Sequence, residues 1–559
     1  MTTVPAATAT LAVLALAGLL PAMALVGLRW ITVPLVPLAG AVVAAVAATC
    51  YLATGGSFMA WFVGLSVLAA GAVLAVWSAR PELRHRPVPA PDGSPTGTSY
   101  RVAGIVGAVA VLAACIWCLR GLGTPTVGFD ARAVWLLRAG WFLQSHHQLL
   151  VKMRVNDVPL IQSVYPPLIS ASAAVAASVT GDQSVRLGVV VVALLNTCAL
   201  TAAAFALVEG GRTCAARLCA RPGPAPGATG AGGAGGASAV SGAGPPTGTT
   251  GAGGAPGPAG EGGGPVAFAP MVVGVVAAVA LVFVGFGITE PFTTNGYADP
   301  LWSMAAVGAM AYGLQLGGRR AEQGAAVILV LVTGMTKNEG LATGAALIVL
   351  IALRSLLAIP AVERRRRWWR PLVLGAAELA AIGAWPVLMR VIHARGVTSS
   401  SHSPIGTWPG RARATADGMA PYLHVLVLAA PIAVVGGLVL SRVRRAGGVG
   451  NDWWSWVALA GGLTAIGGAL VTGVGAIEPW LETTVHRVTE FAALAGWWIV
   501  AMWAVVAAGA PSWERERRAV LPDGTAARPG EGPDGEPPPA AVGGPHGEGG
   551  RMDPGPTAP

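Results

Sequence analysis

Long apolar runs, separated by short polar segments, recur along almost the whole of this 559-residue chain, with clear examples at 32–54 and 58–79. An α-helix needs a run of about 20 apolar residues to cross a bilayer. Charged residues make up only 11% of the sequence, against roughly one-quarter in a soluble domain. These features predict an all-α polytopic membrane protein with about 12 to 14 transmembrane helices.

The basic residues indicate how the chain is oriented in the membrane. The formal net charge of +10 could reflect binding to nucleic acid, but the Lys and Arg residues cluster at the ends of apolar runs. Such clusters mark the cytoplasmic side, and the strongest one comprises residues 364–367 together with Arg370. We therefore expect a multi-pass protein of the cytoplasmic membrane that has no nucleic-acid partner.

Composition divides the chain into six segments. Residues 209–266 are mostly Gly, Ala and Pro, which predicts a disordered linker, and the Pro/Gly-rich residues 511–559 predict a disordered cytoplasmic tail. The other four segments are N-terminal transmembrane helices, an external catalytic loop, further transmembrane helices and C-terminal transmembrane helices, at 1–119, 120–168, 169–208 and 267–510. In this topology the apolar stretch 167–180 begins and ends outside. It is short for a span, so either it is re-entrant or a neighbouring span is misplaced.

The loop at 128–168 is the longest part of the embedded region that is neither an apolar run nor a featureless linker. Asp130 lies at the start of a predicted short amphipathic helix. Three apolar residues follow at helical spacing and lie along one line with this acid: Val134, Leu137 and Trp141. The aromatic residues of this helix suit the lipid–water interface: Trp135, Trp141 and Phe142. Asp130 is read equally well as a helix N-cap and as a catalytic acid.

Polar clusters in the loops expected outside are the candidates for chemistry, because a charge that borders an apolar run is costly unless it has a partner or water. A carboxylate can take a proton from a hydroxyl group as a general base. Lysine or arginine can hold a phosphate leaving group. Besides Asp130, the clusters are Tyr165-Pro166-Pro167-Leu168, the segment 295–299 with Tyr297 and Asp299, and the turn 336–339 with Lys337, Asn338 and Glu339.

Each cluster also has a purely structural interpretation. Lys337 and Glu339 could form an ion pair at a helix end in the interface, and this interpretation is slightly favoured. Asp299 could be the cap of a helix whose first turn begins with Pro300. The Tyr165-Pro166-Pro167 step could be a rigid start of a helix. No single cluster is specific, so their order along the chain is the better signal.

In the order of its motifs, the chain resembles the GT-C superfamily of polytopic glycosyltransferases, which use lipid-phosphate sugars. Protein O-mannosyltransferases and lipid A aminoarabinose transferases belong to it. The matching motifs are GFDARAVW, YPPL, GYADPL and TKNEG. The resemblance implies that Asp130 and Asp299 are the catalytic acids and that Lys337 binds the donor phosphate. His486 and Arg487 are further phosphate-binding candidates by position alone. Supporting roles fall to Tyr165, Pro166, Pro167, Tyr297, Asn338 and Glu339.

The implied reaction transfers a sugar from a polyprenyl-phosphate-linked donor to the hydroxyl group of a lipid, glycan or protein acceptor, at the outer face of the cytoplasmic membrane. Asp130 would be the general base or position the acceptor. Asp299 would assist it or help to bind a divalent cation, and the metal requirement is left open.

Three departures from the family leave the donor and the acceptor open. Ala-Arg follows Asp130 where the best-known members have a second acid. Val164 and Tyr165 stand where glutamate and lysine often precede Pro-Pro-Leu. The long Gly/Ala linker is an insertion.

The alternative is a transporter or flippase for a lipid-linked or hydrophobic solute. Such a protein predicts charges in the middle of spans and repeated halves. Here the charges gather at the ends of the spans and no repeat is visible in the sequence. The sequence therefore favours the enzyme.

Overall fold

The computed structural model describes residues 3–79, 98–123, 125–155, 164–219, 269–290, 292–316, 320–394, 403–446, 453–473, 477–511 and 514. Every regular element in these residues is helical. The chain separates into two units, Met1–Trp513 and Glu514–Pro559, and the helices described below all belong to the first. The predicted linker and tail lie mostly outside the described residues, so their disorder stays a prediction.

Four long helices come first, and they follow the apolar runs of the N-terminal segment. They are α1 (Thr3–Val26), α2 (Thr32–Thr54), α3 (Phe58–Ala79) and α4 (Thr98–Cys118). α1 and α2 pack backbone against backbone, because a Cβ atom added at Gly40 would overlap the backbone oxygen of Leu14. Small residues at such crossings allow two membrane helices to approach closely.

Short helices form the region between α4 and the next long span. They are the 3-10 helix η2 (Leu119–Gly123), the π-helix η3 (Ala131–Leu136), α5 (Leu137–Phe142), α6 (His146–Val155) and α7 (Leu168–Thr180). The long helix α8 (Val185–Cys219) follows. α8 continues past residue 209, so the predicted start of the linker at that point is wrong. Glu209 is buried within the helix, where its Oε1 lies 2.6 Å from Nη2 of Arg212.

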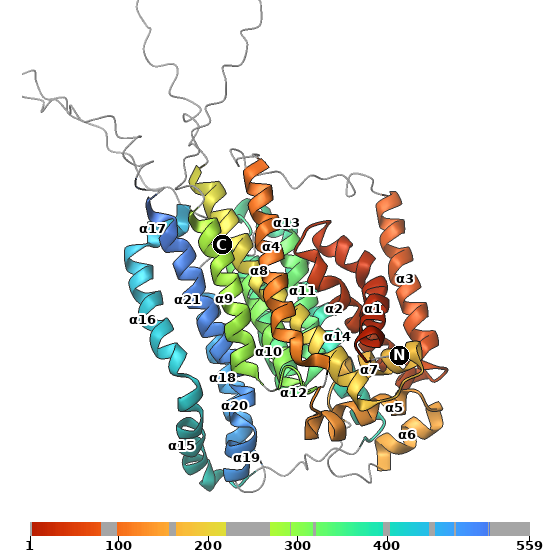
Figure 1. Ribbon diagram of the computed structural model, residues 1–559. Coiled ribbons are helices and arrows are strands. Elements are labelled where there is room, and N and C mark those ends of the chain that lie inside the picture. The colour runs from red at the N-terminus through yellow and green to blue at the C-terminus, as the bar shows by residue number, and fades with distance from the viewer. Residues whose placement is uncertain are drawn as a thin grey trace, which may run out of the picture. The chain divides into compact units, whose positions relative to one another are not determined.

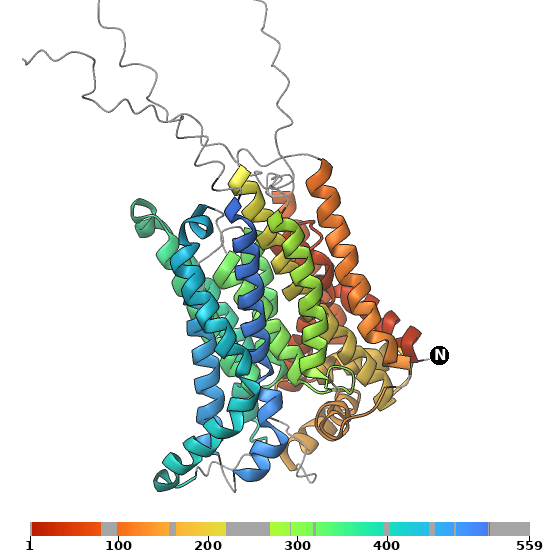
Figure 2. The ribbon, with the colours of Figure 1, turned by 60° about the vertical axis from the view of Figure 1, so that its left-hand side comes forward.

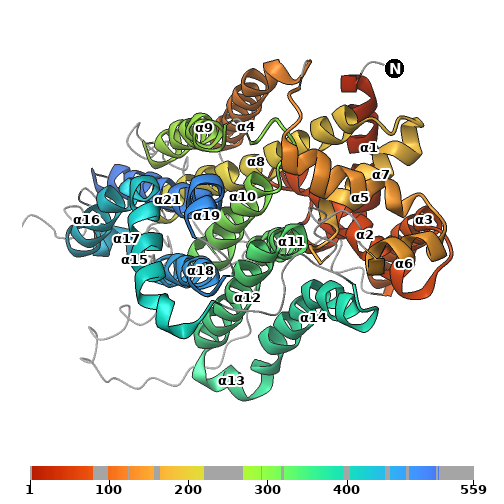
Figure 3. The same cartoon turned by 90° about the horizontal axis from the view of Figure 1, so that it is seen from below.

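The C-terminal half forms the remaining helices. In chain order they are α9 (Ala269–Thr289), α10 (Asp299–Met310), the π-helix η5 (Ala311–Leu316), α11 (Arg320–Thr336), α12 (Asn338–Ala358), α13 (Ala361–Arg367), α14 (Trp369–Val391), η6 (Ile405–Thr407), α15 (Trp408–Met419), η7 (Ala420–Tyr422), α16 (His424–Val439), α17 (Ser441–Ala446), α18 (Trp453–Thr472), α19 (Glu478–Thr483), α20 (Val485–Val488) and α21 (Glu490–Ala508). α10 is buried over its whole length, and Figure 3 places it among α8, α11, α12 and α21. The core of the unit therefore surrounds α10.

Nine helices in the described part of the chain are long and apolar enough to cross a membrane, or up to ten if the bent pair Ile405–Tyr422 and His424–Val439 is one span. The protein is thus an all-α, multi-pass membrane protein. The predicted count of about 12 to 14 spans is higher than the described helices support. Two apolar runs form shorter helices, Gly104–Cys118 and Leu168–Thr180. A third run changes from α-helix to π-helix at Ala311, which leaves α10 too short to span on its own.

The helices of the loop at 128–168 and the arginine-rich helices lie at opposite ends of the first unit (Figures 1 and 2). α5, α6, α7, α15 and α19 lie at one end, named here the loop end. The arginine-rich helices α13 and α17 lie at the other, named here the basic end. α7 has 13 residues, or about 20 Å of helix, against roughly 30 Å for the hydrocarbon core. α7 is therefore shorter than a full span, and the choice between a re-entrant segment and a misplaced neighbouring span stays a prediction.

The helix after Asp130 differs from its prediction in geometry. η3 is a π-helix, in which hydrogen bonds join residues i and i+5, so the side chains that follow are rotated out of the predicted line. Val134 and Trp141 are buried, whereas Leu137 is 46% exposed. The aromatic residues predicted for the lipid interface are instead buried inside the protein: Trp135, Trp141 and Phe142.

Candidate functional site

Arg487 joins two acids that come from distant parts of the chain. Its Nη1 lies 2.8 Å from Oδ2 of Asp130, and its Nη2 lies 3.0 Å from Oδ2 of Asp299. Its Nε also donates to Oδ2 of Asp299, at 3.1 Å. Asp130 directly precedes η3, Asp299 begins α10, and Arg487 lies in α20. The fold therefore brings two of the predicted acids and one predicted phosphate-binding residue into direct contact.

Lys337 holds Asp299 from the other side. Its Nζ lies 2.7 Å from Oδ1 of Asp299 and 3.3 Å from Oε1 of Glu339. Lys337 is the single residue between α11 and α12, and its side chain is only 3% exposed. The prediction of a Lys337–Glu339 pair at the interface is thus corrected. The pair exists, but Lys337 is buried and Asp299 is its nearer partner.

Asp299 is a buried anion rather than a helix cap. It is the first residue of α10, its carboxylate bonds to Lys337 and Arg487, and its side chain is 1% exposed. Burial by itself raises the pKa of a carboxyl, but Lys337 and Arg487 lower the pKa of Asp299 to about 2. Asp299 therefore stays ionised, and each of its oxygens is committed to a cation.

Asp130 is the accessible member of this network. It occupies the N-cap position of η3 but makes no side-chain cap hydrogen bond, so its interpretation as a cap is wrong. Its side chain is 28% exposed, against 11% for Arg487. The turn before it is held by Gly128, whose backbone N–H donates to the oxygen of Asn295 at 3.0 Å. A Cβ atom at Gly128 would overlap the ring of Tyr297.

Aromatic rings cover one side of Arg487. Its Cζ lies 4.6 Å from the ring centre of Tyr297 and 5.9 Å from that of Phe292, distances at which a ring attracts a cation. The ring of His486 lies 5.0 Å from that of Phe292 and 6.0 Å from that of Tyr422. His486 takes no part in the ion pairs found among the described residues. It belongs instead to an aromatic cluster with Phe292, Tyr297 and Tyr422.

A buried arginine fixes the Tyr165-Pro166-Pro167 step. Nη1 and Nη2 of Arg138 donate to the backbone oxygens of Tyr165 and Pro166, at 2.6 and 2.8 Å. Nε of Arg138 donates to Oγ of Ser170 at 3.0 Å. Pro167 occupies the N-cap position of α7, so the step is a rigid start of a helix, as its structural interpretation predicted.

Tyr165 connects this step to the ion-pair network. Its ring stacks on that of Trp135, with centres 5.0 Å apart. Burial raises the pKa of the Tyr165 hydroxyl, and the nearby charge of Glu339 raises it further, so the phenol is neutral beside the network. Asn338 begins α12 next to Lys337. None of the side-chain hydrogen bonds found in the described chain involves Asn338.

The described residues contain no group of three or more His, Cys, Asp or Glu side chains that could hold a metal ion. Asp130 and Asp299, the acids predicted to help bind a divalent cation, already share the guanidinium of Arg487. A cation between them would have to displace Arg487. The residues present therefore do not fit a divalent cation at this position.

Near the site, the sequence prediction missed two buried charged residues, Arg138 and Glu490. Arg138 lies in a helix predicted to be interfacial, where an arginine usually reaches solvent, so no pattern marked it as buried. Glu490 begins α21, and neither of its carboxylate oxygens has a hydrogen-bond partner within the described part of the chain. An acid three residues after Arg487, in front of an apolar run, is the signal that could have identified it.

Comparison with known proteins assigns no family to this chain. Models of protein families, curated proteins and solved structures were each searched, and none matches. The resemblance to GT-C enzymes therefore depends on the motifs of the sequence alone.

Proposed function

We propose that the protein is a membrane glycosyltransferase that moves a sugar from a polyprenyl-phosphate-linked donor to an acceptor hydroxyl at the outer face of the cytoplasmic membrane. The observation that carries this proposal is the bridge from Asp130 through Arg487 to Asp299. The bridge joins an accessible carboxylate, which is suited to accept a proton, to a guanidinium, which is suited to bind a phosphate. The order of the GT-C-like motifs supports the same assignment.

In the proposed reaction, the two partners of the outer ion pair have different roles. The acceptor oxygen forms a bond to the anomeric carbon of the donor sugar. The bond from that carbon to the phosphate oxygen breaks, and its electron pair leaves with the polyprenyl phosphate. Asp130 accepts the proton of the acceptor hydroxyl. Arg487 turns its Nη1 from Asp130 to the phosphate, where it neutralises the charge that develops on the leaving group.

Asp299 and Lys337 keep Arg487 in position for this exchange. The other carboxylate oxygen of Asp299, Oδ1, pairs with Lys337. If Asp299 turned toward a substrate, Lys337 would lose its nearest partner. Breaking a buried pair is strongly destabilising, so this inner pair stays formed while the contact between Arg487 and Asp130 opens. We therefore assign Asp299 as the anchor of the site and Lys337 as its counterion. Neither has the direct role that the resemblance implies.

Sugar transfer by the purified protein tests this function. The full-length protein is reconstituted into liposomes with labelled polyprenyl-phosphate sugars and with lipid or glycan acceptors, and label in a new glycosidic bond is measured. The lipid-linked glycan that accumulates in a deletion strain identifies the donor to use. We expect transfer by the wild-type protein and loss of transfer in Asp130→Asn. Movement of the intact donor across the bilayer, with no new glycosidic bond, would establish the transporter or flippase instead.

A further inference from the structure

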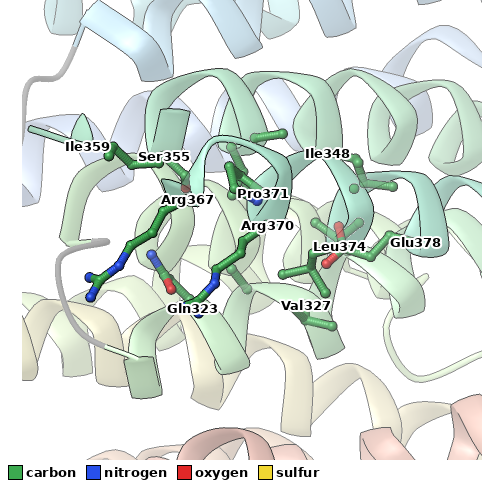
Figure 4. A pocket seen from close by; sticks show the side chains of 15 residues that line it. Gln323, Val327, Ile348, Ser355, Ile359, Arg367, Arg370, Pro371, Leu374 and Glu378 are labelled. Carbon is green, nitrogen blue, oxygen red and sulfur yellow. The ribbon is translucent and has the colours of Figure 1, made fainter. Parts of the chain in front are cut away.

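A cavity lies at the basic end of α11 and α12, whose other ends carry the candidate site. Its volume is about 250 Å³, and it lies between the first half of α11, the second half of α12 and the first half of α14 (Figure 4). The turn that carries Lys337 joins the opposite ends of α11 and α12. The cavity is therefore separate from the site proposed for sugar transfer.

Positive charge is concentrated at one end of this cavity. Arg367, Arg370 and Gln323 line that end (Figure 4). Arg367 also pairs with Glu363 at 2.7 Å, but both side chains are about half exposed, and such surface pairs are weak. The Cζ of Arg370 lies 5.7 Å from the ring centre of Trp369. No hydrogen bond or ion pair of the Arg370 side chain is found within the described residues, so its N–H groups can bind an anion.

Among the described residues, no positively charged one lines the opposite end of the cavity. Glu378 lines this end, eight residues after Arg370 on α14, which is about 12 Å of helix. Glu378 is 8% exposed, and its carboxyl makes no hydrogen bond or ion pair within the described part of the chain. The wall between the two ends is apolar and includes Val327, Ile348 and Leu374. A molecule with an anionic head and an apolar body therefore fits in one orientation, with its head at the arginines.

The size and position of the cavity suit part of a lipid. Pockets that enclose a whole drug-sized ligand have roughly 300–1,000 Å³, so this cavity holds only a portion of a larger molecule. α14 lies at the edge of the unit (Figure 3) and is largely exposed. In a membrane, the exposed face of α14 meets lipid. One acyl chain can thus begin in the cavity while the rest of the molecule stays in the bilayer.

We propose that this cavity binds an anionic phospholipid, with the phosphate on Arg367 and Arg370 and the first part of one acyl chain between α11, α12 and α14. Guanidinium groups hold phosphates through charge-assisted hydrogen bonds, and basic pockets between membrane helices on the cytoplasmic side bind such headgroups. Other arginines of α13 do not line the cavity, among them Arg365 and Arg366. Specific binding in the cavity therefore depends on Arg367 and Arg370. A general attraction to an anionic membrane surface would depend equally on Arg365 and Arg366. This binding does not depend on the proposed sugar transfer.

Lipid titration of the full-length protein tests the site. The protein in detergent is titrated with phosphatidylglycerol or with zwitterionic phosphatidylcholine, and the bound lipid is counted by native mass spectrometry. We expect phosphatidylglycerol to bind in preference. The double variant Arg367→Gln/Arg370→Gln should weaken its binding about tenfold or more, because both phosphate contacts are lost. The matched control, Arg365→Gln/Arg366→Gln, removes the same charge outside the cavity and should change the affinity less than about twofold.

A second variant blocks the apolar part of the cavity. Ala352→Phe places a ring between α12 and α14 without changing any charge, and it should also weaken phosphatidylglycerol binding. Thermal unfolding of each variant shows whether it is folded. Equal losses in the two double arginine variants would overturn the site, because surface charge alone would then account for binding. Displacement of the lipid by inorganic phosphate at equal concentration would overturn the lipid assignment, because the site would then take soluble phosphate.

Discussion

Asp130 and Asp299 bind the same guanidinium, yet their surroundings make them differ in their ability to accept a proton. Asp299 is buried between two cations, and its pKa is lowered to about 2. Asp130 contacts Arg487 and is partly exposed. A general base must be released from its cation and must reach the proton that it accepts. Of the two acids, Asp130 is the one that is partly exposed and contacts a single cation, so we propose that it is the base.

We expect Asp130→Asn to abolish transfer and to leave the fold intact. Asn cannot accept the proton of the acceptor, and the loss of general-base catalysis typically costs about 10²–10⁴ in rate. Asp130 makes no cap hydrogen bond, so the unfolding temperature should stay close to that of the wild type. Transfer is measured in liposomes, and unfolding is followed by tryptophan fluorescence.

The matched control for this variant is Asp417→Asn. Asp417 is an exposed acid on α15, at the same end of the unit as Asp130, and its replacement should leave transfer near normal. An Asp130→Asn protein that transfers sugar at the wild-type rate would refute the role of Asp130 as the base.

Asp299→Asn should instead destabilise the protein. The variant leaves the buried Lys337 with the weaker contact to Glu339, and breaking a buried pair costs about 3–5 kcal/mol. The unfolding temperature at neutral pH measures this loss. An Asp299→Asn protein as stable as the wild type would show that Asp299 is not the anchor.

The lowered pKa of Asp299 also predicts that the stability of the protein depends on pH. The pKa of Asp299 is lowered in the folded protein to about 2, against about 3.9 in an unfolded chain. Above the pKa that Asp299 has in the unfolded chain, its charge therefore contributes its full share to the stability of the fold. This contribution is lost as the pH falls toward the pKa that Asp299 has in the folded protein. Between roughly pH 5 and pH 8, titration of Asp299 should not change the unfolding temperature. Below about pH 4, the stability advantage of the wild type over Asp299→Asn should shrink.

The sequence singled out the charged residues of the site but not how they pair. Motif order identified Asp130, Asp299 and Lys337, position alone added Arg487, and the structure brings all four together. Their pairing depends on which side chains face one another across segments that lie far apart in the chain. No local pattern contains that information, so the buried contact of Lys337 with Asp299 could not be predicted.

At the scale of the element, the start of α7 depends on α5. α7 begins directly after Pro167, and the backbone oxygens of Tyr165 and Pro166 accept hydrogen bonds from Arg138 of α5. Buried backbone carbonyls need a donor. One planar guanidinium supplies donors to both, so it fixes α5 and α7 to each other beside the ion-pair network.

Replacing Arg138 should therefore loosen the contact between α5 and α7. Arg138→Leu removes a donor from two backbone oxygens, at about 1–3 kcal/mol for each buried group left unpaired. We expect a lower unfolding temperature and reduced transfer. Arg138→Lys should restore little, because an ammonium lacks the planar fork that reaches both oxygens. Arg132→Leu is the control, since Arg132 is exposed on η3. Full recovery of stability in Arg138→Lys would contradict this account.

Some limits of long helices could be predicted because a span must be apolar through the bilayer, but α8 continues past its predicted end. The apolar runs at 32–54 and 58–79 form α2 and α3 with the same limits. The π-helices could not be predicted, because an i→i+5 turn has no signature in a pattern that assumes α-helical spacing. The expected apolar line after Asp130 fails at Leu137 for this reason.

At the scale of the first unit, two different sites lie at opposite ends of α11 and α12. The loop end carries the ion-pair network, and the basic end carries the cavity with Arg367 and Arg370. Arginine-rich segments are retained in the cytoplasm. If the basic end faces the cytoplasm, the network lies at the outer face and the cavity lies beside the anionic lipids of the inner leaflet.

Single cysteines at the two ends test this orientation, after the six native cysteines have been replaced. Phe129→Cys lies beside Asp130, Gly406→Cys lies in η6, and Arg365→Cys lies in α13; all three positions are exposed. If the arginines of α13 face the cytoplasm as we propose, an impermeant maleimide should label the first two in intact cells and the third only after the cells are opened. Labelling of Phe129→Cys only from the cytoplasm would make transfer at the outer face wrong, although the ion-pair network would stand. Labelling of all three from one side would contradict the proposed topology and the inner-leaflet position of the lipid cavity together, because both depend on the two ends lying across the bilayer from each other.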